Sequence, residues 1–349
     1  MPGQLIVRAD ATLEKGVGHI MRCIALGQAW RSRGGQLIFL SHCESSRLRQ
    51  RILDEAFTFI PIEKPYPHSS DLNCVLEKLS DIGNRGSNNI WLLLDGYHFD
   101  PAYQRCIKEA GYRLMIIDDT AHLNHYYGDV LLNQNLNAAQ LTYSCEPYTR
   151  LLLGTHYGLL RSEFFSWIDF KREIPEVAHK LLITLGGADP SNQTLMIIRA
   201  MQHLKLERLE VVVLIGPANP HMQVLQSAIN QSKFPIQLIL NPDNMPELMA
   251  WADLAISASG STVLEMLFMG LPALVIIMAE NQVAVAEALA DAGVAVNLGW
   301  YHDLSTTKIA RKMTELVKAA HLRSKMSQRG RNLVDGKGVE RILAELLTA

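Results

Sequence analysis

Short runs of consecutive apolar residues recur along the whole chain and alternate with longer segments of helical periodicity. None of these runs alternates polar with apolar residues, as a strand with one solvent-exposed face would. Strands that are apolar on both faces belong to parallel sheets covered by helices on each side, so the pattern predicts a doubly wound α/β protein. The predicted strands are Leu5–Val7, Leu37–Leu40, Ile90–Leu94, Leu114–Ile117 and Val130–Leu132 in the first half, and Leu181–Leu185, Val211–Ile215, Ile236–Leu240, Leu254–Ile256 and Ala273–Met278 in the second.

The alternation of strands and helices breaks once, between Leu153 and Leu181, where no strand is predicted. A charged stretch at Asp169–Glu173, followed by Pro175, is typical of a connection between domains. The apolar period near the end of the chain predicts a helix that either caps the second domain or crosses back onto the first. The predicted bounds are residues 1–160 for an N-terminal domain, 161–179 for the connection and 180–349 for a C-terminal domain.

Two Rossmann-like domains of this kind would face a cleft lined by the carboxyl ends of their strands. Ligands of open α/β sheets bind at that edge, so polar residues directly after a predicted strand are the first candidates for a functional site.

The composition excludes several classes of protein. The chain has 349 residues, of which 48% are hydrophobic and 19% charged, so intrinsic disorder and fibrous repeats are excluded. A net charge of −2 argues against nucleic-acid partners and stable membrane association. Met1–Asp10 is too poor in apolar residues for a signal peptide, and the longest apolar run, Leu271–Ala279, is too short to span a membrane.

The five cysteines all lie in the first half of the chain and form no CxxC pair. This usage is typical of free thiols in a reducing cytosol and disfavours a zinc site. We therefore expect a cytoplasmic enzyme. Its oligomeric state is left open, with a monomer favoured.

A glycine-containing loop follows the first predicted strand and leads into the first predicted helix. The strand ends near Arg8, Gly16 and Gly18 lie in the loop, and the helix begins near His19. Glycines let the backbone approach a ligand, and a helix N-terminus presents free N–H groups to negative charge. The helix dipole disfavours a protonated imidazole there, so His19 is a candidate general base. We give equal weight to the alternative that His19 only caps this helix or packs in the core.

A turn rich in serine and glycine follows the predicted strand Leu254–Ile256. Ser259, Gly260 and Ser261 place hydroxyl groups and amides at a helix start, an arrangement that suits a diphosphate. Glu265 lies one turn beyond Ser261 on the same helix face, where its carboxylate would accept both hydroxyls of a ribose. From spacing alone, an ordinary exposed glutamate is the better interpretation of Glu265.

Polar residues follow other predicted strands as well. Gly187 lies in a glycine-rich turn after the first strand of the second half, where the same phosphate argument applies. Asp95 and Tyr97 follow another strand, and we favour a functional over a structural interpretation of them. Asn133 and Asn135 are candidates for reading sugar hydroxyls or acetamido groups, or equally for a turn.

Asp118 and Asp119 stand at the end of a further strand, with His122 and His125 close in sequence. A divalent metal is disfavoured here because no third ligand stands at metal spacing. We therefore expect neither a metal nor a cofactor.

In this order, the motifs resemble the UDP-2,4-diacetamido-2,4,6-trideoxy-β-L-altropyranose hydrolases of pseudaminic acid biosynthesis. That family is similar in fold to the GT-B glycosyltransferases, particularly the enzyme that adds N-acetylglucosamine to lipid I. The resemblance implies a GT-B arrangement of two Rossmann-like domains and an enzyme that cleaves a UDP-sugar with water. The segments that carry it are Ile6–Asp10, Gly16–Arg22, Leu94–Tyr97, Ile117–Asp119, Asp129–Asn135, Gly154–Phe165, Gly186–Asp189 and Ile256–Glu265.

The resemblance also implies roles for individual residues. His19 matches the base that activates the attacking water, Glu265 matches a ribose-binding glutamate, and Met245 lies where uracil is held through backbone groups. The other implied substrate-binding residues are Ser259, Gly260 and Ser261 at the diphosphate, Asn281 and Gln282 on the sugar side, and Gly16, Gly18, Arg22, Asp95, Tyr97, Arg161 and Gly187. One departure is Gly96, where some members carry a histidine, and it puts a second histidine base at that position in doubt.

The expected reaction is hydrolysis with inversion at the anomeric carbon, releasing UDP and the free sugar. UDP is a good leaving group whose charge helix-terminus amides can take up, so no acid is required. Two alternatives stay open. A GT-B glycosyltransferase would pass the sugar of a UDP donor to an acceptor, and a non-catalytic UDP-sugar sensor would bind without turnover, so that His19 would be dispensable.

Overall fold

The computed structural model describes residues 3–12, 16–83, 90–216, 219–242 and 244–348. Contacts within the chain divide it into two units. Unit 1 contains the residues up to Ser162 together with those from Lys337 onward, and unit 2 is Glu163–Gly336. Each unit is built on one sheet, and all paired strands in both sheets are parallel.

Unit 1 holds a seven-stranded sheet in the order β3-β2-β1-β4-β5-β6-β7. This is the doubly wound order in which the chain first winds outward from β1 and then returns to continue on its other side at β4. The elements of the unit are β1 (Gln4–Ala9), α1 (Gly18–Ser32), β2 (Gln36–Ser41), α2 (Ser46–Asp54), β3 (Thr58–Pro61), α3 (Ser69–Gly83), β4 (Ile90–Asp95), α4 (Pro101–Glu109), β5 (Arg113–Ile117), β6 (Val130–Asn133), β7 (Arg150–Leu153) and α12 (Gly338–Thr348), with short 3₁₀ turns at Ala138–Gln140, Thr155–Tyr157 and, already in unit 2 for the most part, Ser162–Trp167.

Unit 2 repeats this plan with six strands in the order β10-β9-β8-β11-β12-β13. Its elements are β8 (Lys180–Thr184), α5 (Gln193–Met201), β9 (Glu210–Ile215), α6 (Met222–Asn230), β10 (Ile236–Leu240), α7 (Met245–Trp251), β11 (Leu254–Ala258), α8 (Thr262–Phe268), β12 (Ala273–Ile277), η4 (Glu280–Gln282), α9 (Val283–Asp291), β13 (Ala295–Trp300), η5 (Tyr301–Asp303), α10 (Thr306–Lys318) and α11 (Ala320–Leu333).

The apolar strands bury both of their faces, as the sequence pattern predicts. In β1, Leu5 and Val7 pack into the core under α1 and α12, whereas Ile6 points to the opposite core under α3 and α4. Successive side chains of a strand point to opposite faces, so only a strand without polar positions fills two cores at once. The prediction of two parallel-sheet α/β domains is confirmed.

Three strands were absent from the prediction: β3, β7 and β13. All three lie at an edge of their sheet, so they need not be apolar on both faces. Leu151 of β7 is exposed, β3 ends in Pro61, and Gly299 interrupts the apolar run of β13. These three strands therefore lack the continuous apolar pattern from which the other strands, including the edge strand β10, were predicted.

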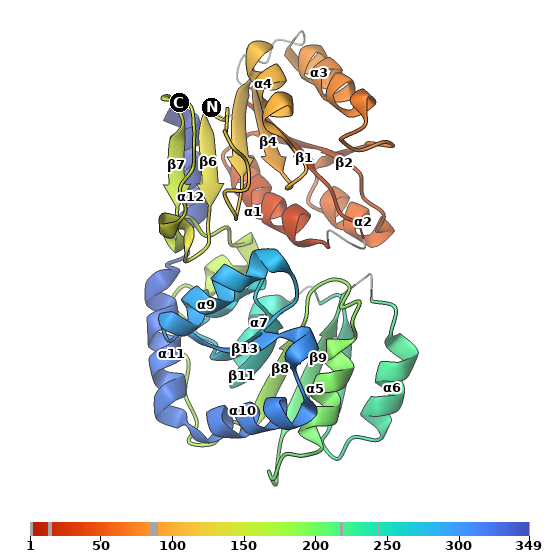
Figure 1. Cartoon of the computed structure of the whole chain (residues 1–349), viewed down its shortest axis with the longest axis vertical. Helices are drawn as coiled ribbons and strands as arrows, with labels where there is room; N and C mark the ends of the chain where they lie inside the picture. Colours follow the sequence, from red (N-terminus) through yellow and green to blue (C-terminus); the bar gives the residue numbers. More distant parts are fainter. Residues whose placement is uncertain (1–2, 13–15, 84–89, 217–218, 243, 349) are drawn as a thin grey trace. The chain divides into compact units, whose positions relative to one another are not determined.

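The last helix of the chain packs on unit 1. Ile342 and Leu346 of α12 belong to the same core as α1, and the indole N–H of Trp91 in β4 donates to the carbonyl of Leu346 at 3.1 Å. In Figure 1, α12 lies beside β6 and β7. Gly338 begins this helix directly against the backbone of Gly158, where any side chain would collide.

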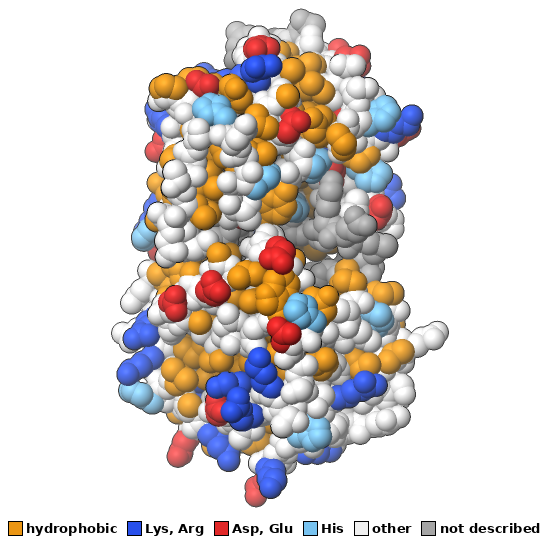
Figure 2. Space-filling model, in the orientation of Figure 1, with side chains coloured by type: hydrophobic (Ala, Val, Ile, Leu, Met, Phe, Trp, Pro, Cys, Tyr) orange, Lys and Arg blue, Asp and Glu red, His pale blue; other side chains and the backbone are white. Residues whose placement is uncertain are grey.

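Charged side chains of both signs are spread over the face shown in Figure 2, with Lys and Arg more frequent over unit 2. All five cysteines are free thiols. Within the residues that the structure describes, no helix combines the length and the apolar character needed to cross a membrane.

Candidate active site

The centre of the candidate site in unit 1 is a histidine–carboxylate pair. Strands β1 and β4 are neighbours in register, with Ala9 opposite Asp95 at the end of β4. There His19, the second residue of α1, places its Nδ1 2.6 Å from Oδ1 of the fully buried Asp95. A carboxylate only accepts hydrogen bonds, so Nδ1 donates in this contact, and in the neutral ring Nε2 then holds the lone pair. This is the tautomer that a general base needs.

Arg22 lies one turn after His19 in α1 and locks the same carboxylate. Its Nε and Nη2 donate to the two oxygens of Asp95 at 2.7 and 2.6 Å, and its Nη1 donates to Asp119 at 2.8 Å. Burial alone would raise the pKa of Asp95, but Arg22 and His19 hold it well below the usual range. The guanidinium predicted to bind substrate therefore pairs with two carboxylates of the chain itself, and its role toward substrate stays a prediction.

Tyr97 and Asn135 complete this cluster around Asp119. The Tyr97 hydroxyl donates to Asp119 Oδ2 at 2.8 Å, and the Asn135 amide donates to Oδ1 at 3.0 Å. The ring of Tyr97 meets the ring of His19 edge to face, with 5.4 Å between centroids. Residues from four strand ends are thus linked into one hydrogen-bonded group around His19.

Asp118 directly precedes Asp119 in the sequence. Its carboxylate is not free, because it accepts hydrogen bonds from other groups of the chain. Its partners are the backbone N–H groups of Thr120 and Ala121 and the Nδ1 of His122. His125 is bound elsewhere, to Ser144 and Glu146. Across the described ranges, no three or more His, Cys, Asp or Glu side chains are grouped so that they could hold a metal ion.

A second buried charge network lies at the end of β1, and sequence reasoning assigned it no role. The guanidinium of the fully buried Arg8 bonds to Asp10 and, at 2.6 Å, to Asp71. Asp10 is also 3.0 Å from Nε2 of His98. The sequence did contain a sign of this network, because the charged residues Arg8 and Asp10 interrupt an apolar run. It could not identify Asp71 as the partner of Arg8, because Asp71 is 63 residues away.

His98 of this network lies next to Gly96, the position where some members of the resembled family carry a histidine. An ideal Cβ placed on Gly96 would lie 2.7 Å from Cε1 of His98. A side chain at position 96 would therefore require the ring of His98 to shift.

The structure also places the remaining residues predicted in unit 1. Gly16 has a φ of +71°, a left-handed conformation that favours glycine, and Gly18 is the first residue of α1. Arg161 is buried close to the end of the continuous part of unit 1. Asn133 is fully buried and donates to the Tyr143 hydroxyl at 2.8 Å, which favours a structural turn over contact with a sugar.

In unit 2, two of the predicted motifs meet at the carboxyl ends of β11 and β12. The Ser259 hydroxyl is 3.2 Å from the carbonyl of Ile276 and 3.4 Å from Oε1 of Gln282. An ideal Cβ on Gly260 would lie 3.7 Å from Nε2 of Gln282. Gln282 is thus a neighbour of Ser259 and Gly260, from which it is more than 20 residues away in sequence.

The other predicted residues of unit 2 follow from the strand order β8-β11-β12, which places three strand ends side by side. Asp243, two residues before Met245, lies outside the described residues. The placements are Gly187 in the turn after β8, Met245 at the start of α7 and buried, Ser261 and Glu265 at the N-cap and in the first turn of α8, and Asn281 in η4 beside Gln282.

Some backbone N–H groups that follow the turn after β8 are already bound by a carboxylate of the chain itself. The carboxylate of Asp189 accepts hydrogen bonds from the backbone N–H groups of Gln193 and Thr194, at 2.8 and 2.9 Å. Those amides begin α5 and would otherwise be available to a phosphate. We therefore restrict the predicted phosphate site in this turn to the backbone around Gly187.

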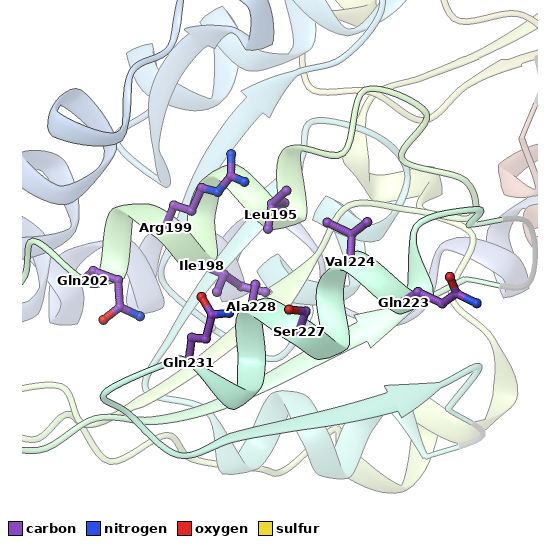
Figure 3. A pocket seen from close by; sticks show the side chains of 9 residues that line it. All are labelled: Leu195, Ile198, Arg199, Gln202, Gln223, Val224, Ser227, Ala228 and Gln231. Carbon is purple, nitrogen blue, oxygen red and sulfur yellow. The ribbon is translucent and has the colours of Figure 1, made fainter.

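A pocket of about 490 Å³ lies between α5 and α6 of unit 2 (Figure 3). Its walls combine aliphatic side chains with amides and one cation, Arg199. None of the residues predicted to bind substrate lines it.

Comparison with known proteins identifies relatives for most of the chain. Residues 181–341, which include most of unit 2, match the glycosyltransferase family 28 C-terminal domain. Over 343 residues the chain is 25% identical to the spore coat polysaccharide biosynthesis protein SpsG of Bacillus subtilis, covering 97% of this chain and 96% of SpsG. A Helicobacter pylori protein named pseudaminic acid cytidylyltransferase and UDP-2,4-diacetamido-2,4,6-trideoxy-β-L-altropyranose hydrolase is 26% identical over 261 residues, which are 74% of this chain and 45% of that protein.

Solved structures agree with this assignment at the level of the fold. MurG of Acinetobacter baumannii has a TM-score of 0.70 at 14% identity, with both chains covered completely. The UDP-GlcNAc 2-epimerase of Neisseria meningitidis, in a structure bound to UDP-GlcNAc, has a TM-score of 0.63 at 15% identity, again over both whole chains. The protein therefore has a GT-B-like fold of two parallel-sheet α/β domains, and its second domain is similar to the C-terminal domains of family 28 glycosyltransferases.

Proposed function

We propose that this protein is a UDP-sugar hydrolase that breaks the anomeric C–O bond and releases UDP and the free sugar. The observation that carries the proposal is the His19–Asp95 pair, which leaves the Nε2 lone pair available to a water molecule. The name of the Helicobacter relative supports UDP-2,4-diacetamido-2,4,6-trideoxy-β-L-altropyranose as the substrate, in pseudaminic acid biosynthesis. We place the enzyme in the cytoplasm, in keeping with its five free cysteines.

The proposed reaction is a single displacement. Nε2 of His19 takes a proton from water while the water oxygen bonds to the anomeric carbon from the face opposite UDP. The electron pair of the breaking C–O bond leaves with the β-phosphate of UDP, so the configuration inverts. The imidazolium that forms is stabilised by the Asp95 carboxylate, which remains ionised throughout because Arg22 holds it.

We propose that the nucleotide binds to unit 2. The turn at Ser259–Ser261 would hold the diphosphate, Glu265 the ribose hydroxyls and the backbone at Met245 the uracil. Asn281 and Gln282 would face the sugar, and the contact between Ser259 and Gln282 supports a joint role for the two motifs. The family match of this part of the chain supports nucleotide-sugar binding there.

Transfer of the sugar to an acceptor is the second candidate function, favoured by the match to a glycosyltransferase C-terminal domain. The two functions share the UDP-sugar and differ in what attacks the anomeric carbon.

Incubation of the purified protein with UDP-sugars in ¹⁸O-labelled water separates these functions. Hydrolysis predicts UDP release without any acceptor and label in the free sugar, because the C–O bond breaks on the sugar side. We expect the same rate with excess EDTA, since the chain's own donors already occupy the carboxylates of Asp118 and Asp119. Label in UDP would show attack at phosphorus, and dependence on an acceptor would establish a transferase.

Replacement of Glu265 by alanine is expected to weaken UDP binding by about 1.5–3 kcal/mol, the scale of hydrogen bonds to a charged group. Isothermal titration calorimetry with UDP measures the change, which corresponds to roughly 10- to 150-fold in Kd. Glu207→Ala, which removes an exposed glutamate of the same unit outside the predicted site, is the control and should bind UDP normally. Unchanged UDP affinity in Glu265→Ala would remove this residue from the nucleotide site.

A further inference from the structure

His122 is held by two hydrogen-bond acceptors at once. Its Nδ1 lies 2.6 Å from Oδ2 of Asp118, and its Nε2 lies 2.9 Å from the backbone carbonyl of Tyr97. Neither a carboxylate nor a carbonyl can donate a hydrogen bond. Both ring nitrogens must therefore carry hydrogens, and this geometry is satisfied only by the imidazolium cation.

The carbonyl that His122 binds belongs to the residue packed against the candidate base. The Tyr97 ring makes edge-to-face contacts with both His19 and His122, with centroid distances of 5.4 and 5.6 Å and interplanar angles of 79° and 88°. Its hydroxyl donates to Asp119. Tyr97 is thus fixed at its backbone, its ring and its hydroxyl, and the backbone contact depends on the charge of His122.

We propose that His122 is a positioning residue: as an imidazolium it clamps the backbone of Tyr97, whose ring then keeps His19 oriented toward water. The inference rests on the proposed hydrolytic function. When Nε2 of His122 loses its proton, its lone pair faces the lone pairs of the Tyr97 carbonyl, and the attraction becomes repulsion. The turn that carries Tyr97 then shifts, and His19 loses the ring against which it packs.

The groups that surround His122 determine at which pH this happens. Asp118 faces it from the turn after β5, and the hydroxyl of Thr120 lies 3.4 Å from Nδ1. Asp119 shares the cation Arg22 with Asp95, and His19 contacts the Tyr97 ring.

The hydrogen bond from Asp118 raises the pKa of His122 above its ordinary value, although burial opposes this. A raised pKa means that the clamp is complete below the ordinary pKa of a histidine and is lost as the pH rises through the raised pKa of His122. We therefore expect kcat to fall on the alkaline side because His122 deprotonates.

The test compares pH profiles of kcat for the wild-type enzyme, His122→Gln, His122→Lys and the control His125→Gln. His122→Gln should lower kcat at neutral pH by roughly 10- to 100-fold, the scale of a misplaced catalytic group. It should leave UDP affinity unchanged and remove the fall of kcat at alkaline pH. His122→Lys, which keeps the positive charge, should restore part of kcat and move this fall to higher pH. His125, bound to Ser144 and Glu146 outside the cluster, should be replaceable without change in the profile.

A second measurement does not depend on turnover. NMR of the ¹³C- and ¹⁵N-labelled histidines, assigned with His122→Gln, should show His122 doubly protonated at pH 7. A neutral His122 at pH 7, or an unchanged fall of kcat at alkaline pH in His122→Gln, overturns the inference and leaves the proposed hydrolysis intact. A protonated His122 in a protein that releases no UDP from any UDP-sugar overturns the hydrolysis, and with it the link to His19.

Discussion

Replacement of His19 by asparagine is expected to lower turnover by about 10²- to 10⁴-fold, the usual cost of losing a general base. Asparagine is polar and of similar size, and its side-chain amide can still donate to Asp95, so the cluster around Asp95 is preserved. It has no ring nitrogen with a lone pair to take a proton from water. The measurement is kcat with the UDP-sugar substrate, accompanied by calorimetric titration with UDP.

UDP affinity should be nearly unchanged in this variant, because we place the nucleotide on unit 2 and His19 lies in unit 1. His156→Asn, at an exposed histidine of the same unit, is the matched control and should retain full turnover. Normal turnover in His19→Asn would disprove the role of His19 as base. Parallel loss of UDP binding would instead indicate that His19 contacts the nucleotide.

Replacement of Asp95 by asparagine is expected to impair both activity and stability. Asparagine can donate a hydrogen bond from its amide to Nδ1 of His19, which would favour the opposite tautomer and place the hydrogen on Nε2. A comparable change in a histidine–aspartate pair costs about 10⁴-fold in kcat in serine proteases, and we expect on the order of 10²–10⁴ here. The variant also leaves Arg22 buried with only Asp119 as its anion.

For the free energy of unfolding we expect a loss of roughly 3 kcal/mol, near the lower end of the range for a broken buried ion pair, because Asp119 remains. The pKa of Asp95 is depressed in the folded protein, so its stabilisation is present above the pKa of an unfolded aspartate and is lost as the pH falls below it. Denaturation measured between about pH 5 and pH 2 should therefore show a flatter decline in Asp95→Asn than in the wild type.

Asp129→Asn is the control for these two effects. Asp129 pairs with Lys108 and the backbone N–H of Leu114 in the same unit, outside the His19 cluster. This variant should lose some stability while each folded molecule keeps its activity. If Asp95→Asn behaves in the same way, Asp95 has only a structural role.

The inner strands of both sheets could be predicted from the sequence because a strand that is buried on both faces has apolar residues at consecutive positions. Parallel pairing follows from that burial, and the carboxyl ends of parallel strands meet at one edge. For the same reason, Asp95, Asp119 and Ser259 could be recognised as candidates from their place after apolar runs. The edge strands β3, β7 and β13 escaped prediction because they lack such a continuous apolar run, although the edge strand β10 was predicted.

What each polar group binds was decided only by the tertiary structure. Arg22 pairs with carboxylates 73 and 97 residues away, and His122 finds its second acceptor in the backbone of Tyr97. Asp189 turns inward to cap its own helix, although its motif is typical of a phosphate turn. Local sequence determines where a strand or helix ends, and hence which side chains reach the functional edge. Their charge states and hydrogen-bond partners depend on distances across the sheet, which arise when strands distant in sequence are packed side by side.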